Sequence, residues 1–100
     1  MVYSIIIPVY NRPIELDELL ESLAAQTAGD FEVVVVEDGS CVPAEKVIEK
    51  YRSRLAITYC IKENAGPGPA RNYGAERAQG DFFIFLDSDT IVPPDYIAIV

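Results

Sequence analysis

The triplet Asp87-Ser88-Asp89 places two carboxylates one residue apart, directly after an aromatic-rich apolar run. Side chains at this spacing can both reach a hard divalent cation across a turn, and such a cation keeps open positions for diphosphate oxygens. A second interpretation stays open, in which one Asp caps a helix that begins near Pro93 and the other is solvated. The position directly after an apolar run strengthens the metal interpretation until the two alternatives stand about level.

The segment from Asn64 to Gly74 combines glycines and prolines with one arginine. Glycines let the backbone approach a ligand closely, and the planar guanidinium of Arg71 suits a diphosphate or a carboxylate. The segment lacks the lysine of a P-loop, and its glycine spacing differs from that of the dinucleotide fingerprint. It is therefore either a rigid loop with a surface arginine or part of an anion site.

Two further residues could contact a nucleotide base. Asp38 lies in the run from Glu37 to Ser40 and could accept a hydrogen bond from a base N–H, although Asp and Gly also form turns. Tyr10 could stack on a base or pack against the protein. Taken alone, each residue favours the structural alternative.

Apolar runs alternate with segments of helical character along the whole chain. The predicted strands cover residues 2–8, 31–36, 56–61 and 82–86, and the predicted helices begin near Pro13, Pro43, Pro69 and Pro93, with Asn11 and Ser40 as candidate caps of the first two. A continuous apolar run is typical of a strand that is buried on both faces of a parallel sheet. The alternation predicts a Rossmann-like α/β fold, a three-layer α/β/α arrangement with strand order 3-2-1-4.

Polar clusters follow each predicted strand. They are Tyr10-Asn11, Glu37-Asp38, Glu63-Asn64 and the triplet from Asp87 to Asp89. In open parallel sheets, ligands bind beyond the carboxyl ends of the strands. The fold is therefore expected to gather these clusters at one edge of the sheet.

Composition and charge exclude several classes of partner. The chain has 100 residues, a net charge of -8 and no His, so a basic face for a nucleic-acid backbone is not expected. Cys41 and Cys60 form neither a CxxC pair nor a zinc spacing, which suits two reduced thiols in a cytosolic protein. No run is long enough to span a bilayer, and Pro8 interrupts the first apolar run too early for a signal peptide.

Four segments, in this order, resemble motifs of the family 2 glycosyltransferases. Ser4 to Asn11 is similar to the first strand and loop of that family, and Val35 to Ser40 is similar to its second-strand motif. Asn64 to Gly74 resembles the next motif, and Gly80 to Asp89 resembles the approach to the DxD triplet of the family. The four segments cover nearly the whole chain, which makes the resemblance specific.

The resemblance implies the N-terminal half of a GT-A fold, with residues 1–100 as its nucleotide-sugar-binding portion. It implies a nucleotide-diphosphate sugar as donor, commonly a UDP-sugar, a Mn²⁺ or Mg²⁺ ion, and transfer with inversion at the anomeric carbon. Arg71 would lie against the nucleotide. The implied nucleotide-binding residues are Pro8, Tyr10, Asn11, Glu37, Asp38, Arg71 and Asp87, and the implied metal ligands are Asp89 and Asp87.

The resemblance also assigns individual roles within this set. Pro8 and Tyr10 would flank the base, and Asp38 would accept a hydrogen bond from it. Asp87 would face the ribose or the metal, and Asp89 would be the direct metal ligand.

The catalytic base of this family lies well beyond the DxD triplet, in the half that builds the acceptor site. The base is therefore expected beyond Val100, and this chain is expected to bind the donor without transferring sugar. The acceptor would be a saccharide or a lipid-linked molecule, as in polysaccharide or cell-wall synthesis. The protein is expected in the cytoplasm or at the cytoplasmic face of the membrane. Apolar surface and unpaired edges beside residues 82–86 are expected to promote homo-oligomers.

Two other classes of function stay open. A non-catalytic nucleotide-binding or regulatory module could use the same half-fold without transferring sugar. A nucleotidyltransferase would also use acidic metal ligands, but it would carry a Gly-rich loop with Arg or Lys after the first strand. That place holds the run from Pro8 to Pro13 (PVYNRP), which argues against a nucleotidyltransferase.

Overall fold

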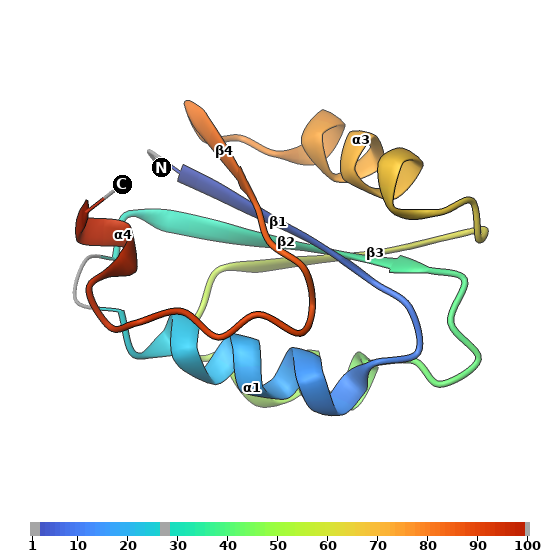
Figure 1. Cartoon of the computed structure of the whole chain (residues 1–100), viewed down its shortest axis with the longest axis horizontal. Coiled ribbons are helices and arrows are strands. Elements are labelled where there is room, and N and C mark those ends of the chain that lie inside the picture. The colour runs from blue at the N-terminus through green and yellow to red at the C-terminus, as the bar shows by residue number, and fades with distance from the viewer. Residues whose placement is uncertain (1–2, 27–28, 100) are drawn as a thin grey trace.

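A computed structural model describes residues 3–26 and 29–99 of the chain. Its centre is a four-stranded sheet in the order β3-β2-β1-β4, and every pairing is parallel (Figure 1). The strands are β1 (Tyr3–Val9), β2 (Phe31–Asp38), β3 (Ile57–Lys62) and β4 (Phe82–Phe85). The predicted parallel sheet and its strand order are confirmed.

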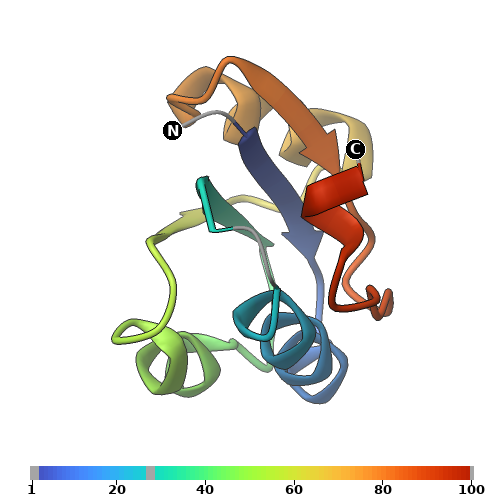
Figure 2. The same ribbon diagram turned by 90° about the vertical axis from the view of Figure 1, so that its left-hand side faces the viewer.

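Helices cover both faces of the sheet, as the sequence predicts. The helices are α1 (Pro13–Ala24), α2 (Glu45–Tyr51), α3 (Pro67–Arg77) and the short α4 (Tyr96–Ile99). Figure 2 shows α1 and α2 on one side of the sheet and α3 on the other. The three-layer arrangement follows from strands that are apolar on both faces.

Strand β2 shows how the sequence serves both layers. All of its residues are buried. Val33 and Val35 belong to the core beneath α1 and α2, whereas Val34 and Val36 belong to the core beneath α3. Successive side chains of a strand point to opposite faces, so one β-branched run supplies both cores.

Helix α3 lies close to the sheet because glycine occupies its contact face. A Cβ atom on Gly74 would lie 2.6 Å from Cγ2 of Ile6 and 3.0 Å from Cγ2 of Val36. Ala70, one turn earlier, is fully buried against the same strands. Small residues on this face set the height of α3 above the sheet, and with it the position of the loop before the helix.

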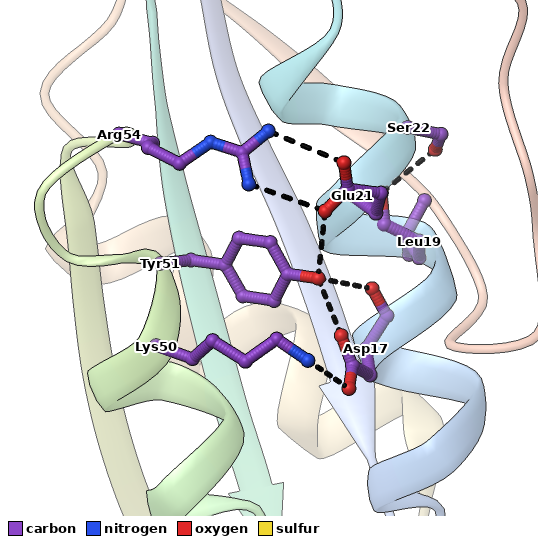
Figure 3. A network of polar contacts seen from close by, with 7 residues as sticks. All are labelled: Asp17, Leu19, Glu21, Ser22, Lys50, Tyr51 and Arg54. Carbon is purple, nitrogen blue, oxygen red and sulfur yellow. Dashed lines mark hydrogen bonds and ion pairs between the residues drawn. The ribbon is translucent and has the colours of Figure 1, made fainter.

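Tyr51 joins α2 to α1 on the opposite face (Figure 3). Its ring is buried, and its hydroxyl donates to the carboxylate of Asp17 and lies 3.1 Å from Oε2 of Glu21. Lys50 and Arg54 form ion pairs with the same two carboxylates. Burial, together with these two carboxylates, raises the pKa of Tyr51 well above its ordinary value, so the hydroxyl stays a donor.

The segment after β4 returns along α1 toward the other end of the sheet (Figure 1). The backbone N–H of Val92 donates to Oγ of Ser22 at 3.3 Å. Gln26 donates to the carbonyl of Pro93 at 2.7 Å and accepts from the N–H of Ile97 at 2.9 Å. Ser22 on α1 and Gln26 just after it therefore fix the path of this segment.

Several element boundaries differ from the prediction. Strand β2 continues through Asp38 because β3 remains paired with it, with Asp38 opposite Lys62. Helix α3 begins at Pro67, two residues before the predicted Pro69, because Gly66 adopts a φ of 98° and allows the chain to turn there. The predicted start of the first strand at Val2 lies outside the described residues.

Both predicted helix caps are wrong. Arg12 stands at the N-cap of α1, and Asn11 lies one residue earlier with a φ of 55°. Ala44 stands at the N-cap of α2, four residues after Ser40. Instead, the side chain of Ser40 accepts a hydrogen bond from the backbone N–H of Asn11, and the side chain of Asn11 accepts one from the backbone N–H of Cys41.

The last helix and the fourth strand are shorter than predicted. Helix α4 begins at Tyr96 rather than at Pro93, and Pro93 accepts a hydrogen bond from the N–H of Tyr96. Strand β4 ends at Phe85, although the N–H of Leu86 still donates to the carbonyl of Ile6 at 3.1 Å. Among the described residues, no helix has both the length and the apolar character needed to cross a membrane.

Candidate functional site

A pocket of about 320 Å³ opens at the carboxyl ends of β1 and β2. Its walls come from the loop after β1, the end of β2, the start of α3 and the segment after β4. The lining residues are Pro8, Val9, Tyr10, Arg12, Asp38, Pro67, Asp87, Ser88 and Asp89. Segments far apart in the sequence thus meet at the edge where the parallel fold was expected to gather them.

The loop after β1 forms one wall of the pocket. Tyr10 follows β1 directly, and 49% of its surface is exposed, so its ring has a free face for a planar ligand. Pro8 and Val9 line the pocket beside it. A half-exposed tyrosine next to a rigid proline can hold a nucleobase by stacking.

Asp38 closes the pocket at the end of β2, and its side chain is almost completely buried. Its Oδ1 accepts from Nζ of Lys62 at 3.2 Å and from the N–H of Ala65 at 3.0 Å. Its Oδ2 accepts from the N–H of Gly66 at 3.0 Å and lies 3.5 Å from Nδ2 of Asn64. The carboxylate therefore holds the whole loop that leads into α3.

The charge on Asp38 is stabilised by this arrangement. Burial alone would raise the pKa of the carboxyl group. The N–H groups of Ala65 and Gly66 and the ammonium group of Lys62 outweigh burial and lower the pKa below its ordinary value. Asp38 is therefore an acceptor and not a donor in the pocket at neutral pH.

The triplet after β4 forms the opposite wall. Asp87 and Asp89 are exposed, and Ser88 between them is buried. The N–H of Thr90 donates to the carbonyl of Asp87 at 3.1 Å and closes a turn. Two carboxylates one residue apart are thus held on a turn that borders the pocket, as the sequence predicts.

The pocket is acidic, with Arg12 as its lining cation. Asp38, Asp87 and Asp89 supply three carboxyl groups. Arg12 also lies 3.6 Å from Oε2 of Glu15, in an ion pair outside the pocket lining. A diphosphate entering this pocket would be repelled unless a cation accompanied it.

The donor set fits a hard divalent cation that is shared with a phosphate ligand. Asp87 and Asp89 offer carboxylate oxygens on the wall of an open pocket. Among residues 3–26 and 29–99, no group of three or more His, Cys, Asp or Glu residues could hold a metal alone. Mg²⁺ in proteins is commonly bound by one or two carboxylates together with substrate phosphates and water, which is the set available here.

Three predicted site residues lie outside the pocket lining. Arg71 on α3 contacts a lining residue, with its Nη2 at 3.4 Å from Oδ1 of Asp87. Both side chains are well exposed, so the pair contributes about 0–1 kcal/mol and the guanidinium can turn toward a ligand at little cost. Arg71 therefore borders the pocket without forming its wall.

Glu37 and Asn11 are the other two predicted site residues that do not line the pocket. Glu37 is buried on the α1 and α2 face of β2, because strand alternation turns it away from Asp38. Its carboxylate accepts hydrogen bonds from Ser40, from the N–H of Ala44 and from the hydroxyl of Tyr59. Asn11 accepts from the loop after β2. Both residues therefore hold the loop after β2 and do not line the pocket.

Four lining residues are absent from the site predicted from the sequence: Val9 and Ser88, which flank predicted residues, and Arg12 and Pro67. Arg12 could have been identified as the one cation in the loop after the first strand. Pro67 could not, because its place in the wall depends on α3 beginning at the positive φ of Gly66.

Comparison with known proteins assigns the chain to a family. The family described as Glycosyl transferase family 2 matches residues 4–100. The chain belongs to this glycosyltransferase family. It is 42% identical over 98 residues to a validoxylamine A glucosyltransferase of Streptomyces hygroscopicus subsp. jinggangensis, a match that covers 94% of this chain and 23% of the relative.

Solved structures of glycosyltransferases share the fold. Residues 1–349 of TarS from Staphylococcus aureus, in complex with UDP-GlcNAc, match with a TM-score of 0.93 and 38% identity, over 99% of this chain and 30% of TarS 1–349. A mannosyltransferase from Pyrobaculum calidifontis, in complex with GDP-Man and Mn²⁺, matches with a TM-score of 0.84 and 27% identity, over 91% of this chain and 28% of that protein. The predicted GT-A-type fold of this family 2 chain is confirmed, and the chain spans less than a third of each of these relatives.

Proposed function

We propose that residues 1–100 form the nucleotide-sugar-binding portion of an inverting glycosyltransferase domain. The donor is a nucleotide-diphosphate sugar, and we assign it as a UDP-sugar. The observation that carries this proposal is the pocket itself, where Tyr10, Asp38, Asp87 and Asp89 converge at the strand ends. The binding of UDP-GlcNAc by the related TarS supports a uridine donor.

Within this proposal the base lies against Tyr10 and Pro8. The half-exposed ring of Tyr10 provides the stacking face. Asp38 accepts a hydrogen bond from a base N–H, because its carboxyl group is held ionised at the pocket wall. Arg71 leaves its weak ion pair with Asp87 and donates to a phosphate oxygen.

Asp89 and Asp87 would hold Mn²⁺ or Mg²⁺ beside the diphosphate. When bound, such an ion neutralises negative charge on the leaving diphosphate as a Lewis acid. The Mn²⁺ in the related mannosyltransferase structure supports this assignment.

We assign no acidic residue of this chain as the base that deprotonates the acceptor. That base and the acceptor site are proposed to lie beyond Val100 in the parent protein. The acceptor would be a saccharide or a lipid-linked molecule. The chain by itself would therefore bind the donor without transferring sugar.

Two statements about the protein as a whole complete the proposal. We place it in the cytoplasm or at the cytoplasmic face of the membrane, because the free thiols of Cys41 and Cys60 suit a reducing compartment. We also propose that the chain self-associates through the exposed edge of β4, where Phe82, Phe83 and Phe85 stand in solvent.

Titration calorimetry of UDP with Mn²⁺ and with a chelator tests the metal assignment. UDP is expected to bind more tightly with Mn²⁺, and Asp89→Ala is expected to remove most of the metal-dependent affinity, a loss of about tenfold or more for a charge-assisted contact. Asp81→Ala is the matched control, because Asp81 is an exposed aspartate directly before β4, at the other end of that strand, and does not line the pocket. Equal affinity of the unsubstituted chain with Mn²⁺ and with chelator would refute the metal role.

A further inference from the structure

Two loops beside the candidate site are joined to each other by hydrogen bonds. One follows β1 and carries Tyr10, Asn11 and Arg12. The other follows β2 and contains residues 39–42. Of these positions, Tyr10 and Arg12 line the pocket. What fixes the first loop therefore fixes one wall of the site.

The buried carboxylate of Glu37 is the anchor of the second loop. Its Oε2 accepts from Oγ of Ser40 at 2.6 Å, and its Oε1 accepts from the N–H of Ala44 at 2.7 Å. Oε1 also accepts from the hydroxyl of Tyr59 on β3 at 2.7 Å. A buried carboxylate with three donors is costly to disturb, because each lost partner leaves part of its charge without compensation.

Ser40 links Glu37 to the first loop through two hydrogen bonds. Its hydroxyl donates to Glu37 and at the same time accepts from the backbone N–H of Asn11 at 2.9 Å. Donation to a carboxylate polarises a hydroxyl and makes its oxygen a better acceptor. Glu37 therefore acts on Asn11 through Ser40.

Asn11 binds back to the second loop. Its Oδ1 accepts from the N–H of Cys41 at 2.7 Å and from the N–H of Val42 at 3.0 Å. The backbone of Asn11 has a φ of 55°, which asparagine tolerates better than most residues. The two loops are thus joined by hydrogen bonds in both directions.

We propose that Glu37, Ser40 and Asn11 form a positioning network that sets the place of Tyr10 and Arg12 in the nucleotide pocket. None of the three is required to touch the ligand, and Glu37 acts only through Ser40. This inference rests on the proposed function for its consequence in binding. The fixing of the loop itself is a property of the chain alone and can be measured without any ligand.

Ser40→Ala is the decisive variant, because it removes the link and leaves the other two partners of Glu37 in place. Amide hydrogen exchange followed by NMR is expected to show exchange at Asn11 about tenfold faster than in the unsubstituted chain, while amides of β2 keep their rates. The affinity for UDP with Mn²⁺ is expected to fall by about threefold to tenfold. Ser40→Thr keeps the hydroxyl and is expected to restore both values.

Ser22→Ala is the matched control, since Ser22 also bridges two segments through its hydroxyl but lies on α1, away from the pocket lining. It is expected to leave exchange at Asn11 and UDP affinity unchanged. Unchanged exchange at Asn11 in Ser40→Ala would overturn the network. Faster exchange with full UDP affinity would overturn its positioning role. If the unsubstituted chain fails to bind UDP, the proposed function fails, and the exchange rates alone decide whether the network fixes the loop.

Discussion

Asp38 shows how one side chain can serve both the fold and the site. Its carboxylate lines the pocket and also holds the N–H groups of Ala65 and Gly66. Without this carboxylate, these two N–H groups would lose the acceptor that holds the loop before α3 against β2. A ligand that bonds to Asp38 therefore meets an acceptor whose position is already fixed.

Replacing Asp38 by Asn tests this role through stability. The NH₂ group of the new amide is a donor and cannot accept from the N–H or ammonium group that faces it. The free energy of unfolding at pH 7 is therefore expected to fall by about 1–3 kcal/mol. Urea denaturation of the variant and the unsubstituted chain measures the difference. Asp95→Asn, at an exposed position, is the control and is expected to change stability by less than about 0.5 kcal/mol.

The pH dependence of this difference has a definite sign. The folded-state pKa of Asp38 is lowered from 3.8, so the stabilising contribution of its charge is present above pH 3.8 and is lost as the pH falls through the lower folded-state value. The destabilisation by Asp38→Asn is therefore expected to be smaller at pH 3 than at pH 7. An equal difference at both pH values would contradict the charge-based account.

The sequence predicted which residues lie at strand ends more reliably than it predicted the face of the sheet to which each side chain points. Asp38, Tyr10 and Asp89 line the pocket because they stand at strand ends of a parallel sheet. Glu37 has the same sequence context as Asp38 but points to the other face, because β2 continues through both residues. The sequence did not show where β2 ends, and so could not separate the two roles.

Among the elements, α3 depends on one glycine for its contact with the sheet. Gly74→Ala would gain up to about 1 kcal/mol of helix propensity. The added Cβ would meet branched methyl groups of Ile6 and Val36, which cannot move away freely, and overpacking of this kind costs about 1–3 kcal/mol. The net expectation is a destabilisation of about 1–2 kcal/mol, measured by thermal or urea unfolding.

Gly68→Ala in the same helix separates the two effects. No atom lies within 4 Å of a Cβ at this position, so only the propensity gain remains. This variant is expected to be as stable as the unsubstituted chain or slightly more stable. Equal effects of the two substitutions on stability would show that close packing of Gly74 against Ile6 and Val36 does not limit the residue at this position.

Helices and strands were predicted well where continuous apolar runs or a regular spacing of apolar residues determine them. Strands β1 and β2 follow from buried β-branched runs, β3 and β4 from shorter apolar and aromatic runs, and α1 from leucines at helical spacing. Helix α3 was placed two residues late, because its start depends on a backbone angle at Gly66 that composition does not reveal. The caps were misassigned since Asn11 and Ser40 can satisfy a loop as readily as a helix end.

At the scale of the molecule, β4 is an exposed edge of the described sheet. It stands beside β1 alone, and its side chains Phe82, Phe83 and Phe85 are 61%, 44% and 47% exposed. An apolar strand edge of this kind favours pairing with another chain. The net charge of -8 opposes association, but salt screens this repulsion beyond about 8–10 Å.

We expect a dimer or higher oligomer at micromolar concentration. Burial of about 300 Å² of apolar surface contributes about 7 kcal/mol at 25 cal/mol per Å², which is comparable to the cost of association. Light scattering of the chain and of a Phe83→Ser, Phe85→Ser variant tests this, and the variant is expected to shift toward the monomer of 11.0 kDa. A monomeric unsubstituted chain without concentration dependence would rule out this association.

We propose that the pocket beyond β1, β2 and β4 binds a nucleotide diphosphate together with a divalent cation. Titration of the isotope-labelled chain with UDP and Mg²⁺, followed by amide chemical shifts, locates the ligand most directly. We expect the largest shifts at Tyr10, Asp38 and Ser88. Shifts that cluster instead around Phe31 and Leu55, beside the cavity at the opposite end of the strands, would contradict it.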